Sequence, residues 1–80
     1  MRIKQAVAER FATLCKEAKI KPNELATRSG VTPSTVYSML DPSREDVNIT
    51  TIKKLCDGLE ITVPDFFNTD EFKNLEQEIK

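Results

Sequence analysis

The chain contains no histidine, and among its 80 residues there are only two cysteines, two glycines and four prolines. The absence of histidine excludes zinc fingers of the Cys/His kind, histidine-based catalytic triads and the usual general base near neutral pH. The sequence also has no glycine-rich phosphate loop and no carboxylate pair that suggests a pocket. We therefore predict that the protein is not an enzyme and that it holds no metal or cofactor.

Long apolar runs are missing as well. No run approaches the roughly 20 residues of a membrane span, and no signal-peptide apolar region follows Met1. Cys15 and Cys56 lie within helical apolar patterns and are too few for a disulfide framework, so we interpret both as reduced core residues. These features predict a cytoplasmic protein with no membrane partner.

The charged residues are distributed unevenly between the two halves of the chain, although the net charge is only −1. Residues 1–40 hold seven Lys and Arg against three Asp and Glu, whereas residues 41–80 hold five against ten. Such a split suggests a basic working face and an acidic remainder. The alternative interpretation is the ordinary variation of a solvated surface.

The spacing of the apolar residues predicts an all-α domain. Apolar positions recur with the helical period over residues 4–18 and again, over a shorter stretch, from Pro22 to Ser29. Proline suits the first position of a helix, and Ile20 and Leu25 are placed to form a hydrophobic staple around this second start. No segment alternates with period two, so we expect no sheet.

A glycine then interrupts the helical pattern, and a third helix begins at once. Gly30 can take a positive φ without a Cβ penalty, which allows a sharp turn. Thr32 is a good N-cap and Pro33 a good first residue for a helix that runs to about Leu40. The inner face of this helix is apolar, whereas its outer face carries Ser34, Thr35, Tyr37 and Ser38.

The second half of the chain predicts further helices after a loop. Asn48 can cap a fourth helix, whose apolar stripe begins at Ile49, and Thr62 can cap a short fifth one. A polar tail helix is predicted over residues 69–80, which leaves residues 1–68 as the main domain. The predicted core consists of Val7, Phe11, Leu14, Leu25, Ala26, Val31, Val36, Leu40, Ile52, Leu55, Leu59 and Phe66.

The second and third helices together have the pattern of a helix-turn-helix unit, in which a turn of three or four residues joins two short helices. Such helices cross closely, and Ala26 with Gly30 supplies the small residues that the crossing needs. Hydroxyl groups on the outer face can bond base edges, and a tyrosine can bond a phosphate. DNA recognition is thus favoured over a merely amphipathic helix with a neutral polar face.

Three stretches resemble the phage-repressor and Cro-like (XRE) family of helix-turn-helix transcriptional regulators. The segment "LATRSGVTPSTVYSML" is similar to the family's helix-turn-helix, "FATLCKEAKIKPNELA" to its first helix and the lead into the second, and "NITTIKKLCDGLEITVPDFF" to its fourth and fifth helices. Together the likeness covers residues 7–67. It implies a compact five-helix, lambda-repressor-like DNA-binding domain over residues 1–68, followed by the tail helix.

The resemblance also implies which residues meet DNA. In this family the third helix lies in the major groove of double-stranded DNA, so base-edge contacts map onto its outer face and its N-cap. Phosphate contacts map onto the start of the second helix and onto the loop after the third. The candidate DNA-binding residues are Lys21, Asn23, Thr32, Ser34, Thr35, Tyr37, Ser38, Ser43 and Arg44.

The sequence departs from the family pattern at three places. Pro33 stands where other members can carry a base-reading amide. Lys19 and Glu60 stand where the family usually has glycine, which predicts altered turns. Glu45 and Asp46 acidify a loop that is often basic in relatives, which weakens the expected attraction to phosphate.

Two functions are compatible with these observations. The first is a sequence-specific DNA-binding transcriptional regulator, by resemblance a repressor. The alternative is a non-enzymatic protein-interaction module that has kept the fold and lost DNA binding, which the pI near 5.4 and the acidic loop favour. We expect no second domain that would hold a small-molecule ligand, so any control signal is expected from the protein's abundance or from another protein.

A homodimer is expected, because one recognition helix reads too few base pairs to select a site in a genome. The apolar residues near the C-terminus form the predicted interface, and the alternative is that Phe72, Leu75 and Ile79 fold back onto the protein's own core. The interface residues are Phe66, Phe67, Phe72, Leu75 and Ile79.

Overall fold

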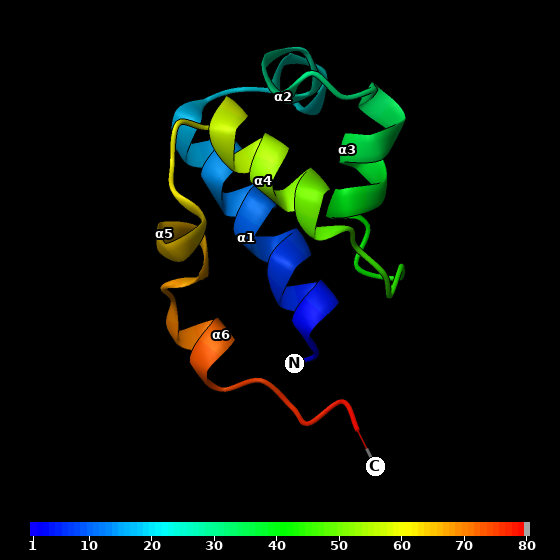
Figure 1. Ribbon diagram of the computed structural model, residues 1–80, viewed down its shortest axis with the longest axis vertical. Coiled ribbons are helices and arrows are strands. Elements are labelled where there is room, and N and C mark those ends of the chain that lie inside the picture. The colour runs from blue at the N-terminus through cyan, green and yellow to red at the C-terminus, as the bar shows by residue number, and fades with distance from the viewer. Residues whose placement is uncertain (80) are drawn as a thin grey trace.

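The computed structural model describes residues 1–79, and within them the chain forms helices and no strand, which confirms the all-α prediction. None of the described helices has both the length and the apolar character needed to cross a membrane. The elements are α1 (Ile3–Ala18), α2 (Pro22–Ser29), α3 (Pro33–Leu40), α4 (Ile49–Gly58), α5 (Val63–Phe67) and α6 (Asp70–Lys73) (Figure 1).

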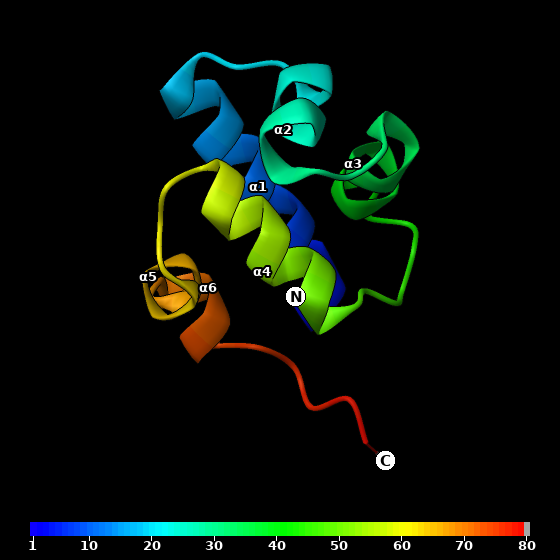
Figure 2. The ribbon, with the colours of Figure 1, turned by 45° about the horizontal axis from the view of Figure 1, so that its top comes forward.

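The helices pack so that α3 is supported from two sides. Helix α2 packs against α3 and α4, and α1 contacts α3 and the short α6. Helix α5 packs against α4. Figure 2 shows α2 and α3 at one side of the molecule and α5 with α6 at the other, so the helix-turn-helix unit and the C-terminal helices lie apart.

Local capping explains where the central helices begin. Thr32, Asn48 and Thr62 each accept, through a side-chain oxygen, a hydrogen bond from a backbone N–H two or three residues later, at 2.7–3.3 Å. These three predicted starts are confirmed. Gly30 ends α2 in the left-handed conformation at φ 70°, where a residue with a Cβ would be strained. A Cβ there would meet nothing within 4 Å, so φ and not crowding requires the glycine.

The core lies between α1, α2, α3, α4 and α5 and agrees with most of the prediction. Phe11, Leu25, Val36, Leu55 and Phe66 are fully buried. Four predicted core residues, Leu14, Val31, Leu40 and Leu59, are only partly buried and pack against the edge of this cluster.

Both cysteines are buried free thiols, as predicted, and burial raises the pKa of each thiol. The expected start of the α4 stripe is wrong, because Ile49 is 66% exposed at the first position of that helix. Lys19 and Glu60 both adopt positive φ, at 58° and 59°, so the two turns do use the conformation that glycine tolerates best.

The predicted tail helix over residues 69–80 is largely wrong. Helix α6 covers only Asp70–Lys73, residues 75–79 form no helix, and residue 80 lies outside the described residues. Residues 75–79 lie against the start of α1, where the Met1 carbonyl accepts a 3.1 Å hydrogen bond from the Glu76 N–H. Contacts with α1 therefore take the place of the helical hydrogen bonds that the sequence pattern predicted.

The four phenylalanines form one cluster within the chain. The Phe11 and Phe66 ring centroids are 4.3 Å apart, and Phe72 lies 5.8 Å from Phe66 and 4.8 Å from Phe67. Phe66 is fully buried and Phe72 packs against the core, so the predicted dimer surface is wrong for these residues. The single turn of α6 brings Phe72 back onto the core, which was the alternative interpretation. Ile79 remains 76% exposed.

Candidate functional site

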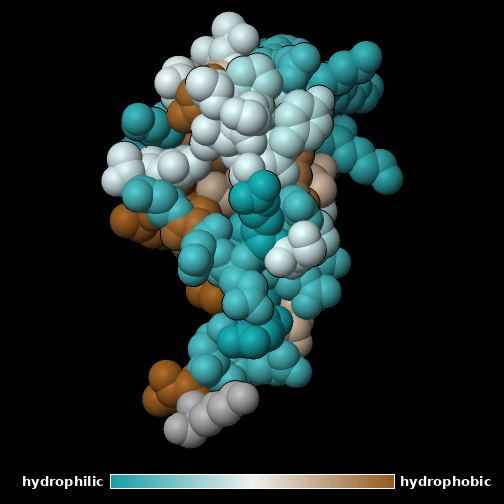
Figure 3. All heavy atoms as spheres, turned by 90° about the vertical axis from the view of Figure 1, so that its right-hand side faces the viewer, coloured by the Kyte–Doolittle hydropathy of each residue, from teal (hydrophilic) through white to brown (hydrophobic). Residues whose placement is uncertain are grey.

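The outer face of α3 is uncharged and accessible. Helix α3 contains no charged residue. Ser34 and Tyr37 are exposed, Tyr37 to 54%, whereas Thr35 and Ser38 are half-buried. Figure 3 faces this side of the molecule, and its upper half is a pale area of intermediate hydropathy bordered by hydrophilic residues. Such a face offers hydrogen-bonding groups without fixed charge.

A cluster of hydroxyl groups marks the start of α3. The Thr32 Oγ1 lies 3.1 Å from the Ser34 Oγ and 2.9 Å from the Thr35 Oγ1, and it also caps the Thr35 N–H. The Thr32 hydroxyl is therefore engaged in ending the turn, which the sequence also predicted. Ser34 and Tyr37 are the members of the candidate set on α3 whose side chains project most freely.

The start of α2 exposes backbone donors beside two candidate residues. Lys21 is the N-cap residue and is exposed, as is Asn23. No side chain from the described part of the chain caps this end, so its first N–H groups are open to an anion. Farther along, Arg28 is paired with Glu24 at 2.7 Å, whereas Lys21 joins no ion pair among residues 1–79.

The loop after α3 is ordered by its own polar groups. Ser43 donates two hydrogen bonds to the Asp41 Oδ1, from its hydroxyl at 2.7 Å and from its backbone N–H at 2.9 Å. These bonds hold the pKa of the Asp41 carboxyl below its usual range. Arg44 is exposed and, among residues 1–79, joins no ion pair. The candidate cation is thus presented beside a structured turn.

A hollow separates α3 from the segment that leads into α4. Ser34 and Ser38 line one side, and Asp46, Asn48 and Thr51 line the other. The sequence singled out Asp46 only as an acidic departure from the family, and its place opposite the α3 hydroxyls depends on how the loop folds back. The carboxylate puts negative charge beside the face that would approach phosphates.

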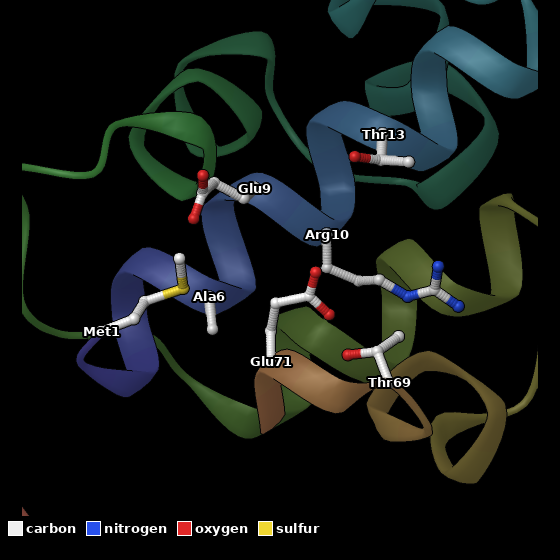
Figure 4. Close-up of a pocket in the computed structure, with 7 residues that line it drawn as sticks. All are labelled: Met1, Ala6, Glu9, Arg10, Thr13, Thr69 and Glu71. Carbon is white, nitrogen blue, oxygen red and sulfur yellow. The ribbon is translucent and has the colours of Figure 1, made fainter. Parts of the chain in front are cut away.

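A second hollow lies between α1 and α6, away from α3 (Figure 4). Arg10, whose side chain lines this hollow, donates hydrogen bonds to the backbone carbonyls of Phe66 at 2.9 Å and Asp65 at 3.1 Å. The guanidinium therefore fastens the end of α5 to α1. Because its charged group is engaged in holding the fold together, we assign this hollow no binding role.

The sequence pattern did not identify Lys4 as a residue that contacts α3. Lys4 in α1 is 4% exposed, and its Nζ lies against the end of α3. The available signal was a lysine three and four residues before Val7 and Ala8, on the buried face of α1. A lysine at the edge of a helix normally extends to solvent, so the pattern alone does not predict its burial.

Comparisons with known proteins agree with this arrangement. The family model for the Cro/C1-type HTH DNA-binding domain matches residues 10–71 of the chain. The crystal structure of the prophage Lp1 protein 11 is similar to the chain with a TM-score of 0.79 and 32% sequence identity. That similarity covers 94% of this chain and 100% of the other. Among curated proteins, none matches the chain.

Proposed function

Because the chain belongs to the Cro/C1-type helix-turn-helix DNA-binding domains, we propose that it is a cytoplasmic repressor that reads the major groove of double-stranded DNA with α3. The observation that carries this proposal is the uncharged, hydroxyl-bearing outer face of α3, which is supported by packing against α1 and α2. A helix with such a face can enter the groove without repulsion from phosphates.

Sequence reading is assigned to α3. Ser34, Thr35 and Ser38 hydroxyls donate to or accept from base edges, and their small size allows the helix to lie deep in the groove. Tyr37 reaches a phosphate or packs on a sugar. Thr32 contributes mainly by capping α3, because its hydroxyl already bonds the Thr35 N–H.

We assign the positioning of the protein along the duplex to two groups of residues that contact the DNA backbone. Lys21 and Asn23 approach a phosphate together with the uncapped N–H groups of α2. Ser43 and Arg44 approach a second phosphate from the loop after α3. Few cations take part and Asp46 opposes them, so affinity depends on salt less steeply than in a strongly basic domain.

A second candidate function is favoured by the acidic loop. Glu45 and Asp46 are exposed beside α3, and the same face could bind a basic protein surface instead of DNA. Salt dependence alone would not separate the two, because both involve charge. Selection of a preferred duplex separates them, since a protein-binding module has no sequence preference in DNA.

The regulator is proposed to act as a homodimer. Two modules related by a two-fold axis place their α3 helices about 34 Å apart, one turn of the duplex, and read a palindrome. With Phe66 buried and Phe72 packed against the core, we take the exposed apolar side chains of Met1, Ile3 and Ile79, which lie near the two ends of the chain, as candidates for the contact. Hydrogen bonds from the start of α1 to Glu78 hold these two chain ends together.

The deciding experiment is selection of binding sites from a random pool of duplexes, followed by titration of the selected site and of a scrambled one. We expect a palindromic site bound at least about 1,000-fold more tightly than the scrambled duplex. Equal affinity for both duplexes would refute sequence-specific recognition. Sedimentation of the protein alone and with the selected site then gives the stoichiometry, and one protein per duplex would refute the dimer.

A further inference from the structure

The end of α3 is held by a buried lysine from another helix. The Lys4 Nζ donates hydrogen bonds to the backbone carbonyls of Ser38 at 3.2 Å, Met39 at 3.0 Å and Asp41 at 2.8 Å. An ammonium group has three donors, and here each of them has a carbonyl partner. The side chain is 4% exposed, so the ammonium is almost completely removed from bulk water.

Helix α3 is only partly capped by its own backbone at this end, where the Asp41 N–H donates to the Ser38 carbonyl at 3.4 Å and the Arg44 N–H donates to the Asp41 carbonyl at 3.2 Å. Its last turn contains no basic residue, and the residue that follows it, Asp41, is extended and not left-handed. The last carbonyls of a helix lack intrahelical partners and carry the negative end of the helix dipole. The Lys4 ammonium gives the Met39 carbonyl a donor, adds a second donor to the Ser38 and Asp41 carbonyls, and supplies the compensating charge.

The contact joins α3 to α1, which is the longest helix of the described residues. Lys4 precedes Ala6, Val7 and Ala8, which are all buried on the inner face of α1. The stem of Lys4 is therefore fixed by the packing of α1, and its head fixes the last turn of α3. That turn carries Ser38 and leads directly into the loop that presents Ser43 and Arg44.

We infer that Lys4 is a positioning residue for DNA recognition, which sets the orientation of α3 and of the following loop without touching DNA. This inference rests on the proposed function. A carbonyl cage around one ammonium is directional, so it fixes the helix end more closely than apolar packing would. Loss of the ammonium should therefore misplace base contacts while leaving the non-specific attraction to phosphates.

Two matched variants separate position from charge. Lys4→Met keeps the apolar stem and removes the ammonium, whereas Lys16→Met removes one exposed lysine from the same helix. For each, affinity is measured for the selected and for a scrambled duplex at one salt concentration. We expect Lys4→Met to lower the ratio of the two affinities at least fivefold, about the value of one base contact. Lys16→Met should leave the ratio unchanged, and Lys4→Arg, which keeps donors, should restore part of it.

Amide hydrogen exchange provides a readout that does not need DNA. In Lys4→Met the amides of α3 should exchange faster than in the parent, while those of α2 should not change. An unchanged affinity ratio in folded Lys4→Met would overturn the inference, and faster α3 exchange without a change in the ratio would show that Lys4 has a structural role only. If the parent itself shows no sequence preference, the proposed function has failed, and the exchange of α3 alone then decides on Lys4.

The parent protein provides the test if Lys4→Met does not fold. Burial lowers the pKa of the Lys4 ammonium; the Asp41 charge raises this pKa and the Arg44 charge lowers it further. Lys4 also lines a hollow whose other charged residues are Arg2, Arg44, Glu45, Asp46 and Glu78. The Lys4 side chain is followed by NMR as the pH is raised from neutral. Lys4→Arg, which stays charged, is the control for DNA bases and other groups that titrate at alkaline pH. A fall in the affinity ratio with the Lys4 midpoint that Lys4→Arg does not show supports the inference, and a constant ratio through that midpoint overturns it.

Discussion

The backbone of Gly58 in α4 lies so close to Ser29 in α2 that a Cβ on Gly58 would stand 2.1 Å from the Ser29 Oγ. Rotation of the serine would remove that clash, but the Ser29 Cβ and Cα would still be 3.2 and 3.3 Å away. We predict that Gly58→Ala lowers the free energy of unfolding by about 1–3 kcal/mol through overpacking. Alanine otherwise favours a helix over glycine by about 1 kcal/mol, so a loss measured by denaturant unfolding reports the crossing.

Ser29→Ala is the matched partner of that variant. The Ser29 Oγ is buried and has no hydrogen-bond partner among the described residues, so its removal should leave stability unchanged or raise it. In the Ser29→Ala background, Gly58→Ala should cost less than in the parent. Equal costs in the two backgrounds would show that the two residues do not limit the approach of α2 to α4.

Ser34→Ala and Ser38→Ala test base reading by α3. Each variant should relax the preference at particular base pairs of the selected site by at most about 1–3 kcal/mol, because one hydroxyl contact is lost. Competition between single-base variants of the site measures the effect. A uniform loss across all duplexes would show that these hydroxyl groups position the protein and do not read sequence.

Arg44→Ala tests the phosphate contact of the loop. Affinity should fall alike for all duplexes, and the slope of log affinity against log salt should decrease by about 1. Lys73→Ala, which removes an exposed cation from α6 on the far side of the molecule, is the control and should leave the slope unchanged. An unchanged slope in Arg44→Ala would remove this residue from the interface.

Lys19→Gly and Glu60→Gly test the two left-handed turns. An L-residue in this conformation costs roughly 1–2 kcal/mol, and glycine avoids that cost while losing more entropy on folding. We expect each substitution to raise the free energy of unfolding by up to about 1 kcal/mol. Lys16→Gly, inside α1, should lower it by a similar amount. Destabilisation by all three would mean that these side chains contribute more than their backbone strain costs.

The attachment of the C-terminal segment should depend on pH. The Glu78 carboxylate accepts hydrogen bonds from Arg2, at 2.7 and 3.0 Å, and from the Ile3 N–H, and the Arg2 bond in particular lowers the Glu78 pKa below its ordinary 4.5. The attachment is therefore complete above that ordinary value and lost as the pH falls through the lower pKa of the folded protein.

Hydrogen exchange of the Ile3 amide measures this attachment. Protection at neutral pH should disappear under acid conditions in the parent and should be absent at every pH in Glu78→Ala. Glu71→Ala, which removes an exposed carboxylate from α6, should behave as the parent. Protection that persists in Glu78→Ala would show that the Ile3 amide is shielded by other contacts.

The order of helices could be predicted because its signals are local. Apolar spacing and the caps at Thr32, Asn48 and Thr62 involve residues within one helical turn of each other. The burial of Lys4 and the requirement for Gly58 could not be predicted, because each depends on a neighbour that is distant in sequence. The prediction of a tail helix was wrong for the same reason, since the contacts of the C-terminal segment with the start of α1 join residues at opposite ends of the chain.

The candidate site was predictable in part. Helical spacing placed Ser34 and Tyr37 on the exposed side of α3, where they are found. Thr32 was predicted as the N-cap, and its hydroxyl bonds the Thr35 N–H, but the resemblance also placed it among the residues that contact bases. Helical spacing did not place Asp46 opposite α3, because a loop without periodicity gives no register. The DNA contacts themselves stay a prediction.

The composition of the chain makes Tyr37 a built-in optical probe. There is no tryptophan and only one tyrosine, and that tyrosine is 54% exposed in the middle of α3. Intrinsic emission from the tyrosine ring therefore arises from the surface assigned to DNA, whereas far-ultraviolet dichroism reports the helices. A change in tyrosine emission at constant helix content therefore reports ligand association on the unlabelled native chain, with no substitution introduced into the face under study.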